Sequence, residues 1–281
     1  MNWSRAKNIS IICLLALNVL LSGLIYYTSK KYTLTSEQER NVYSFLARGS
    51  VSLTGNIVKN YAPMPALITE TEPLDADAVC GWFFPKADGV ETSYDDTSTV
   101  FTLGAAVLTV DGGTLSYYDA DCDVEQGTTL AAAEKLCLDF LALGGDSFSG
   151  FTLDRSYEQD GIYTLEYREK YKSTVVYSDA ASFTVNAAGI AEADISLGEI
   201  SSEGNSREIL SPDAAIYLLV QSLNYYFGNE PVTVEKMDIV YVGDDNGSAG
   251  GTAEPNYRFY ISGAEQPVLV NAYTGVVDAG L

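Results

Sequence analysis

The clearest structural signal in this chain is an uncharged stretch close to its beginning. Residues 9–27 have the sequence ISIICLLALNVLLSGLIYY, which is 19 residues without a charge. A helix needs about 20 apolar residues to cross the hydrocarbon core of a bilayer. A cleaved signal peptide is the alternative, but its apolar region would be shorter, and Leu21-Ser22-Gly23-Leu24 is a poor small-x-small cleavage site. The sequence therefore predicts an uncleaved transmembrane helix over 9–27.

Charge on either side of this helix bears on its orientation. Residues 1–31 contain four basic residues, Arg5, Lys7, Lys30 and Lys31, and no Asp or Glu, whereas the remainder carries 12 basic and 38 acidic residues. The numbers of positive charges on the two sides of the span are nearly equal, so they do not fix its orientation. The large acidic region favours a short cytoplasmic tail over 1–8 and an extracytoplasmic C-terminal region. We expect a single-pass protein of the cell membrane.

Composition also narrows the classes of function. A formal net charge of −22 argues against binding nucleic acid through a basic patch. The chain has no histidine, which excludes Ser-His-Asp and Cys-His catalysis and His-ligated metal ions. No pair of the 38 carboxylates stands out as a catalytic acid and base. We therefore expect no enzymatic activity and no catalytic residue, metal ion or cofactor.

One acidic turn partly resembles a calcium-binding loop. Asp119, Asp121 and Asp123 alternate like the start of a calcium loop, but Val124 and Leu130 stand where an EF-hand requires Gly and Glu. With Glu125 these residues form either a weak calcium site or, as we favour, a solvated acidic turn. The same applies to Asp244-Asp245-Asn246-Gly247.

The cysteines leave two alternatives open. Cys13 lies in the predicted span, and Cys80, Cys122 and Cys137 form an odd set beyond it. In an oxidising compartment a Cys80–Cys122 disulfide could form, and three unpaired thiols fit the sequence equally well. Cys137 has the spacing of a buried residue on a helix face.

Beyond the span, the sequence predicts a region of mixed elements over 32–124. Ser36 forms a capping box with Glu39 at the start of a short helix, because both residue types satisfy free backbone N–H groups there. Apolar runs over 79–84 and 100–110 predict strands. Asp111-Gly112-Gly113 predicts a hairpin turn.

Two further segments, 125–200 and 207–281, share one order of elements. The first opens with a helix capped by Thr129 and continues with strands over 163–167 and 182–186. The second opens with a helix capped by Ser211 and continues with strands over 232–242, 256–262 and 268–271. The caps lie 82 residues apart, and Val185-Asn186-Ala187 lies 85 residues before Val270-Asn271-Ala272. This spacing indicates an internal repeat. The expected fold class is α+β, a transmembrane helix followed by repeated helix-plus-antiparallel-sheet units.

Both ends of the chain resemble a known family. The opening MNWSRAKNI over 1–9 runs directly into the span, and the closing strands contain YRFY over 257–260 and VLVNAYTGVV over 268–277. These motifs resemble the YycI (WalI) family and, more loosely, PepSY-type domains. The resemblance implies PepSY/cystatin-like units and a membrane-anchored accessory regulator of an essential cell-wall two-component system. Such a protein contacts the sensor histidine kinase together with a YycH-like sister, and the sign of its effect differs between lineages.

The candidate partner-binding residues of the membrane segment are Trp3, Asn18, Ser22 and Gly23. Asn18 lies near the middle of the span, where its amide is unfavourable in lipid unless it bonds to another helix. Ser22 and Gly23 follow about one turn later, where small side chains permit close approach. The alternative is that a single-pass anchor tolerates one Asn without any contact.

A second candidate surface consists of tyrosines, which favour half-exposed strands as well as interfaces. It comprises Tyr225, Tyr226, Tyr257, Tyr260 and Tyr273. Packing within the domain is the alternative use of these residues. The alternative function for the whole chain is an anchored extracytoplasmic PepSY-type module that binds a ligand or inhibits a protease independently of a kinase.

Overall fold

The computed structural model describes residues 3–71, 73–85, 88–95, 97–122, 124, 126–228, 230–243, 251–264 and 266–279. The chain divides into two compact units. Unit 1 comprises Met1–Met64, Ser206–Asp238 and Asn256–Leu281, and unit 2 comprises Pro65–Asn205 and Ile239–Pro255. Both units are therefore discontinuous in sequence, whereas the sequence analysis expected the contiguous segments 32–124, 125–200 and 207–281.

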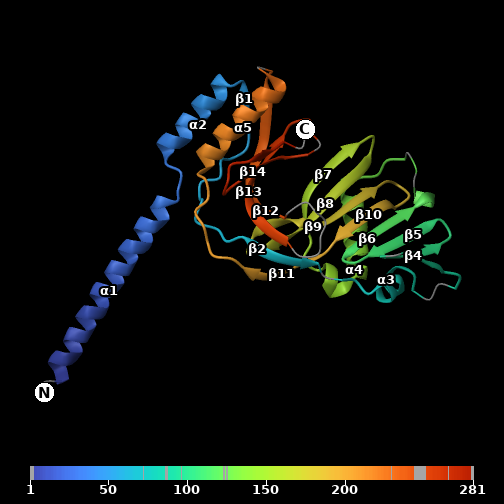
Figure 1. Ribbon diagram of the computed structural model, residues 1–281, viewed down its shortest axis with the longest axis horizontal. Helices are drawn as coiled ribbons and strands as arrows, with labels where there is room; N and C mark the ends of the chain where they lie inside the picture. Colours follow the sequence, from blue (N-terminus) through green and yellow to red (C-terminus); the bar gives the residue numbers. More distant parts are fainter. Residues whose placement is uncertain are drawn as a thin grey trace. The chain divides into compact units, whose positions relative to one another are not determined.

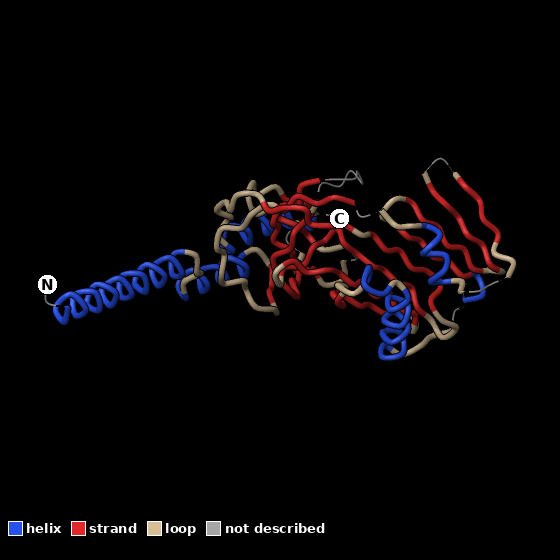
Figure 2. Tube along the Cα trace, turned by 90° about the horizontal axis from the view of Figure 1, so that it is seen from below, coloured by secondary structure: helices blue, strands red, loops and turns tan. Residues whose placement is uncertain are grey.

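Unit 1 begins with two helices, α1 (Trp3–Lys31) and α2 (Ser36–Arg48). Figure 2 shows α1 as one long uninterrupted helix at the N-terminal end. Residues Lys7–Tyr27 of α1 are long and apolar enough to cross a membrane. The expected helix after the span is present, but its capping box involves Thr35 and Gln38 rather than Ser36 and Glu39. Thr35 Oγ1 accepts the Gln38 N–H at 3.3 Å and Gln38 Oε1 accepts the Thr35 N–H at 3.0 Å, because Thr35 is the extended residue.

A small sheet and a third helix complete unit 1. Its strands are β1 (Val51–Leu53), β12 (Val232–Val242, to Asp238 in this unit), β13 (Gly251–Ile261, from Asn256 in this unit), β14 (Val268–Asn271) and β15 (Val277–Asp278). The strand β1 is parallel to β12, and β14 is antiparallel to both β13 and β15. The helix α5 (Pro212–Phe227) contacts α2 and β14 (Figure 1). Ser211 is its N-cap residue and Pro212 its first helical residue, as predicted.

Unit 2 is built on a broad antiparallel sheet. Its strands follow one another in the order β3 (Glu91–Tyr94), β4 (Ser98–Leu103), β5 (Ala106–Asp111), β6 (Thr114–Asp119), β10 (Ile190–Ser196), β9 (Thr174–Val185), β8 (Ile162–Tyr171) and β7 (Thr152–Gln159). A second group pairs β2 (Leu67–Thr71) with β11 (Gly198–Glu203) and with the first residues of β13. The first residues of β9 also pair with Val240 and Tyr241 of β12.

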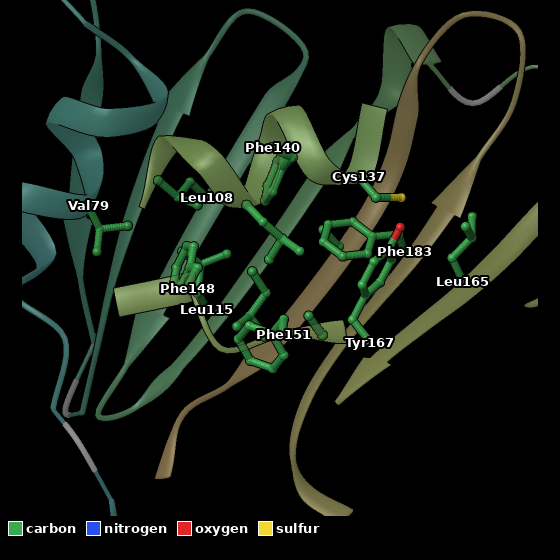
Figure 3. Packing of buried hydrophobic residues seen from close by; sticks show 14 of the residues in the cluster. Val79, Leu108, Leu115, Cys137, Phe140, Phe148, Phe151, Leu165, Tyr167 and Phe183 are labelled. Atoms are coloured by element: carbon green, nitrogen blue, oxygen red, sulfur yellow. The ribbon is translucent and has the colours of Figure 1, made fainter. Parts of the chain in front are cut away.

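Two helices, α3 (Ala76–Phe83) and α4 (Leu130–Leu143), pack with one face of this sheet. Between them and the strands lies an apolar cluster that Figure 3 shows from close by. Phe183 is fully buried in it, with its ring centroid 5.5 Å from that of Phe140 and 5.7 Å from that of Tyr167. Two short 3-10 helices, Ala120–Cys122 and Gly145–Phe148, flank the sheet.

Two strand predictions were wrong in detail. Residues 79–84, predicted as a strand, lie largely in α3, because Asp75 caps the N–H groups of Asp77 and Ala78 and starts a helix there. The run over 100–110 forms two strands, since Gly104 adopts a φ of 62° and turns the chain between β4 and β5. The turn after Asp111, the Thr129 cap of α4 and the strands β8, β12 and β14 agree with the sequence analysis.

The structure is thus a mixed α+β protein with an apolar N-terminal helix and extensive sheets. It does not confirm the repeat. The helix α4 leads into strands that all pair within unit 2, whereas α5 leads into β12 and β13, which contribute residues to both units. The repeated PepSY-like organisation remains a prediction.

Candidate functional site

The first part of the candidate site is the surface of α1. Asn18, Ser22 and Gly23 are all exposed, as is Trp3 at the start of the helix. Asn18 and Ser22 lie one turn apart on the same face, because residues four apart are neighbours on a helix. Nothing in the chain comes within 4 Å of a Cβ built on Gly23. Residues Lys7–Tyr27 are exposed on every side of α1, so spacing along the helix, and not exposure, distinguishes this face.

The second part lies where α1 ends, and we call Lys31, Tyr32, Tyr61 and Glu208 the collar. The Lys31 ammonium lies 2.8 Å from Glu208 Oε1, and the Tyr32 hydroxyl donates to the same oxygen at 2.9 Å. The Tyr61 hydroxyl donates to the backbone carbonyl of Lys31 at 3.2 Å, and the rings of Tyr32 and Tyr61 meet edge to face at 6.0 Å. Side chains from three separate segments of unit 1 thus converge on the end of α1.

Backbone hydrogen bonds reinforce the collar. The N–H of Tyr61 donates to the Tyr32 carbonyl at 3.0 Å, and the N–H of Leu34 donates to the Lys59 carbonyl at 2.8 Å. The side-chain hydrogen bond to Glu208 raises the pKa of Lys31, and its reciprocal effect lowers the pKa of Glu208. Both groups are solvent-exposed, so water screens their attraction and the backbone bonds matter more. The chain leaving α1 is therefore fastened to the rest of unit 1.

The structure does not bring the five candidate tyrosines together into one surface. Tyr225 and Tyr226 are 84% and 56% exposed near the end of α5, with ring centroids 5.2 Å apart. Tyr257 is fully buried, and its hydroxyl donates to the Leu210 carbonyl at 2.6 Å. This tyrosine is a core residue rather than a partner contact, because no surface of it is available.

The other two tyrosines also have partners within unit 1. The Tyr273 hydroxyl donates to the Met64 carbonyl at 2.8 Å, and the Arg207 guanidinium lies 4.2 Å from the centroid of the Tyr273 ring. Lys236 and Arg258 both lie over the Tyr260 ring, at 5.2 and 4.8 Å. Only Tyr225 and Tyr226 of the predicted patch retain a largely free surface.

The cysteines and the described part of the acidic turn can be compared with the sequence predictions. All four cysteines are free, so of the two alternatives for Cys80 and Cys122 the structure has unpaired thiols. Cys122 Sγ lies 3.6 Å from Asp119 Oδ2, and burial raises the pKa of Cys137 to about 12. Asp123, Glu125 and the 244–247 turn lie outside the described residues. Among the residues described, no three or more Cys, Asp or Glu side chains gather to hold a metal ion.

Two polar constellations were not predicted from the sequence. Glu208 and Tyr61 of the collar lie 177 and 30 residues from Lys31, too far for any local pattern to reveal the contact. Arg258 is fully buried and forms two bonds with Asp238, Nε to Oδ1 at 2.9 Å and Nη2 to Oδ2 at 2.8 Å. Its position within the aromatic YRFY stretch of a strand was the one feature of the sequence that could have indicated its burial.

Comparison with known proteins gives a result at the level of fold. No family model matches the chain, and no curated protein matches it. An uncharacterized protein from Eubacterium rectale has a similar solved structure, with a TM-score of 0.54 and 10% identity over 81% of this chain and 88% of that chain. The C-terminal domain of YpeB from Bacillus megaterium has a TM-score of 0.46 and 14% identity over 74% of this chain and 98% of that domain. The first of these likenesses shows a shared fold, and membership of the YycI family remains a prediction.

Proposed function

We propose that this chain is a membrane-anchored accessory regulator of a sensor histidine kinase, acting by protein–protein contact together with a YycH-like sister. The observation that carries the proposal is an Asn near the middle of the apolar part of α1, together with a collar that fastens α1 to the rest of unit 1. An Asn amide at that depth is unfavourable in lipid unless it bonds to another helix. In this proposal residues 1–8 are cytoplasmic, residues 9–27 cross the membrane, and the rest of unit 1 and all of unit 2 are extracytoplasmic.

The proposed mechanism is a difference in binding free energy between two states of the kinase. If α1 binds one signalling state more tightly, it shifts the kinase equilibrium by that difference, without chemistry of its own. An interhelical hydrogen bond from an Asn amide contributes about 0.6–2 kcal/mol within a membrane. About 1.4 kcal/mol changes an equilibrium tenfold, so one such bond is enough to alter kinase activity measurably.

The test compares two single substitutions on α1. The kinase and the sister protein are reconstituted in bilayers with the intact chain, with the Asn18→Leu variant or with the Leu20→Ala variant. Leu20→Ala is the control, because two residues correspond to about 200° of rotation and Leu20 therefore lies on the opposite face of α1 from Asn18. We expect the intact chain and Leu20→Ala to change the autophosphorylation rate equally and Asn18→Leu to lose most of that change. An unchanged rate with the intact chain would refute the proposal.

A second experiment separates this proposal from the kinase-independent module. Residues 9–27 are replaced by an unrelated membrane helix, and co-purification of the kinase from membranes is measured. Loss of the kinase supports recognition by α1. Absence of the kinase from every preparation, including the intact chain, would favour an anchored wall-side module that works independently of a kinase.

A further inference from the structure

The sheet of unit 2 has a second face, turned away from the apolar cluster, that we call the open face. Strand pairing places its residues in rows across the sheet. One row runs Thr102, Val107, Tyr118, Glu192, Thr184, Thr164, Tyr157. The next row runs Val100, Thr109, Ser116, Asp194, Ser182, Glu166, Arg155. Successive side chains of a strand alternate between faces, so these rows lie opposite the buried Phe101, Leu108 and Phe183.

The open face is accessible to solvent at its centre. Ser116 and Tyr118 of β6 and Glu192 and Asp194 of β10 are all exposed, and Tyr157 at the far end of the first row is 44% exposed. Figure 1 shows α3 and α4 near one side of these strands, in keeping with the cluster on the other face. Within the described part of the chain, no helix or loop therefore buries the middle of the two rows.

Hydroxyl side chains predominate on the open face. Its positions on β4, β5, β6, β10 and the paired part of β9 contain no Lys or Arg, whereas β8 and β7 contribute Arg168 and Arg155. The Ser116 hydroxyl donates to Asp194 Oδ1 at 2.7 Å, which orients that carboxylate. Tyr118, 39% exposed, and Tyr157 are the aromatic rings of the first row, and the Arg155 guanidinium lies 5.3 Å from the Tyr157 ring centroid. Short hydroxyl side chains thus lie between two rings.

These properties discriminate among possible partners. Unit 2 contains six basic and 29 acidic residues, which disfavours nucleic acid and anionic lipid. Ser, Asp and Glu are depleted at the centres of protein–protein interfaces, where Tyr, Trp, Phe, Met and Arg are enriched. The middle of the open face, between Tyr118 and Tyr157, consists of the depleted types Ser116, Ser182, Glu192 and Asp194 together with threonines. A partner rich in hydroxyl groups fits it best, because each Ser or Thr both donates and accepts and each carboxylate accepts two or more hydrogen bonds.

We propose that the open face binds a neutral sugar chain laid across β6, β10, β9, β8 and β7. Neighbouring strands lie about 4.8 Å apart, so Tyr118 and Tyr157, four strands apart, are separated by about 19 Å. This span accommodates several sugar rings. The two tyrosine rings offer apolar platforms to the faces of the terminal sugars, and Glu192, Asp194 and the intervening threonines bind the hydroxyl groups between them.

The test measures binding of the hexamer of N-acetylglucosamine and of cellohexaose to the full-length chain in detergent micelles, by saturation-transfer NMR and titration calorimetry. The variants are Tyr118→Ala and Tyr157→Ala. The matched control is Tyr94→Ala, because Tyr94 is 79% exposed on β3 of the same unit but pairs in register with Thr99, on the row that faces away from the open face. Circular dichroism confirms that each variant is folded.

We expect at least one hexamer to bind, both open-face variants to weaken binding tenfold or more, and Tyr94→Ala to match the unmodified chain. Binding of neither hexamer would overturn the proposal, as would equal weakening by all three variants. An oligolysine that binds the open face in place of the sugars would also overturn it and would identify a basic protein partner. None of these outcomes bears on the kinase contact of α1, which involves other residues.

Discussion

The two units differ sharply in charge. Unit 1 carries ten basic and nine acidic residues, a net charge of +1, whereas unit 2 carries six basic and 29 acidic residues, a net charge of −23. The acidity of the chain therefore belongs to one unit and is not a general property of the protein. The unit that contains the apolar helix α1 is nearly neutral.

Their interiors differ as well. Unit 2 buries an apolar cluster in which aromatic rings contact one another, and unit 1 buries the guanidinium of Arg258 against Asp238. An apolar core is stabilised by the area removed from water and is sensitive to cavities. A buried ion pair contributes little net stability but is strongly destabilising when one partner is lost. The comparison predicts different responses to substitution in the two units.

The largest effect should come from the core of unit 2. Phe183→Ala removes a fully buried ring and should lower the free energy of unfolding by about 3–5 kcal/mol, because the neighbouring rings cannot close the cavity. Urea unfolding followed by Trp82 fluorescence measures the loss, since Trp82 packs against this cluster. Leu153→Ala, at a partly exposed position of β7, is the control and should change stability by less than about 1 kcal/mol. A similar loss in both variants would contradict the assignment of the core.

The ion pair of unit 1 should be nearly as sensitive. Asp238→Ala leaves the Arg258 guanidinium buried without this carboxylate and should cost about 3 kcal/mol. Lys236→Ala is the matched control, because Lys236 lies 3.0 Å from the same carboxylate but is half-exposed and should contribute about 1 kcal/mol or less. Chemical denaturation of both variants gives the two values. Equal losses of stability in the two variants would show that the ion pair of Asp238 with Lys236 contributes as much as its pair with Arg258.

Alkaline pH should distinguish the interiors further. Burial raises the pKa of the Cys137 thiol to about 12, so the folded state holds the neutral form while the unfolded chain ionises near pH 8.5–9. Stability from this group is complete below the unfolded pKa and falls as pH rises toward the folded pKa, by at most about 1.4 kcal/mol per pH unit. Urea midpoints measured from pH 8 to 11 should fall less steeply in Cys137→Ala. Identical slopes in the two proteins would contradict the burial of this thiol.

The smallest effect on stability should come from the collar. Glu208→Gln removes the ion pair with Lys31, but both groups are exposed, and the melting temperature should stay unchanged within error. The backbone bonds from Tyr61 and Leu34 remain in this variant. Differential scanning calorimetry in micelles checks this, with Lys59→Gln, which loses the comparable Glu39 pair, as the control. A clear fall in Glu208→Gln alone would show that the collar contributes to folding as well as to orientation.

Local signals in the sequence account for the elements that were predicted well. The uncharged stretch over 9–27 is long enough to define α1 without reference to any other residue, and Thr129 starts α4 by bonding the Ala132 N–H three positions later. Where two local signals compete, prediction is weaker. Residues 79–84 are apolar enough for a strand, and the Asp75 cap decides for a helix.

The candidate site divides in the same way. Asn18, Ser22 and Gly23 could be selected from the sequence because their positions on one helix are set by a regular rotation per residue. The five tyrosines could not be sorted, because burial of Tyr257 and exposure of Tyr225 depend on which strand or helix covers each ring. Tyrosine occurs both in protein cores and at interfaces, so the neighbouring sequence does not show which of the two a given tyrosine belongs to.

Neighbouring residues or composition are enough to predict the long apolar helix, the caps of α4 and α5, most strand-forming segments and the exclusion of histidine chemistry. Tertiary structure alone decided the rest. It joined Met1–Met64 with the C-terminal segments into unit 1, brought Glu208 to Lys31, and set the strand registers that gather hydroxyl groups on the open face. These contacts link residues far apart in the chain, and they form because the packing of whole elements determines which distant side chains meet.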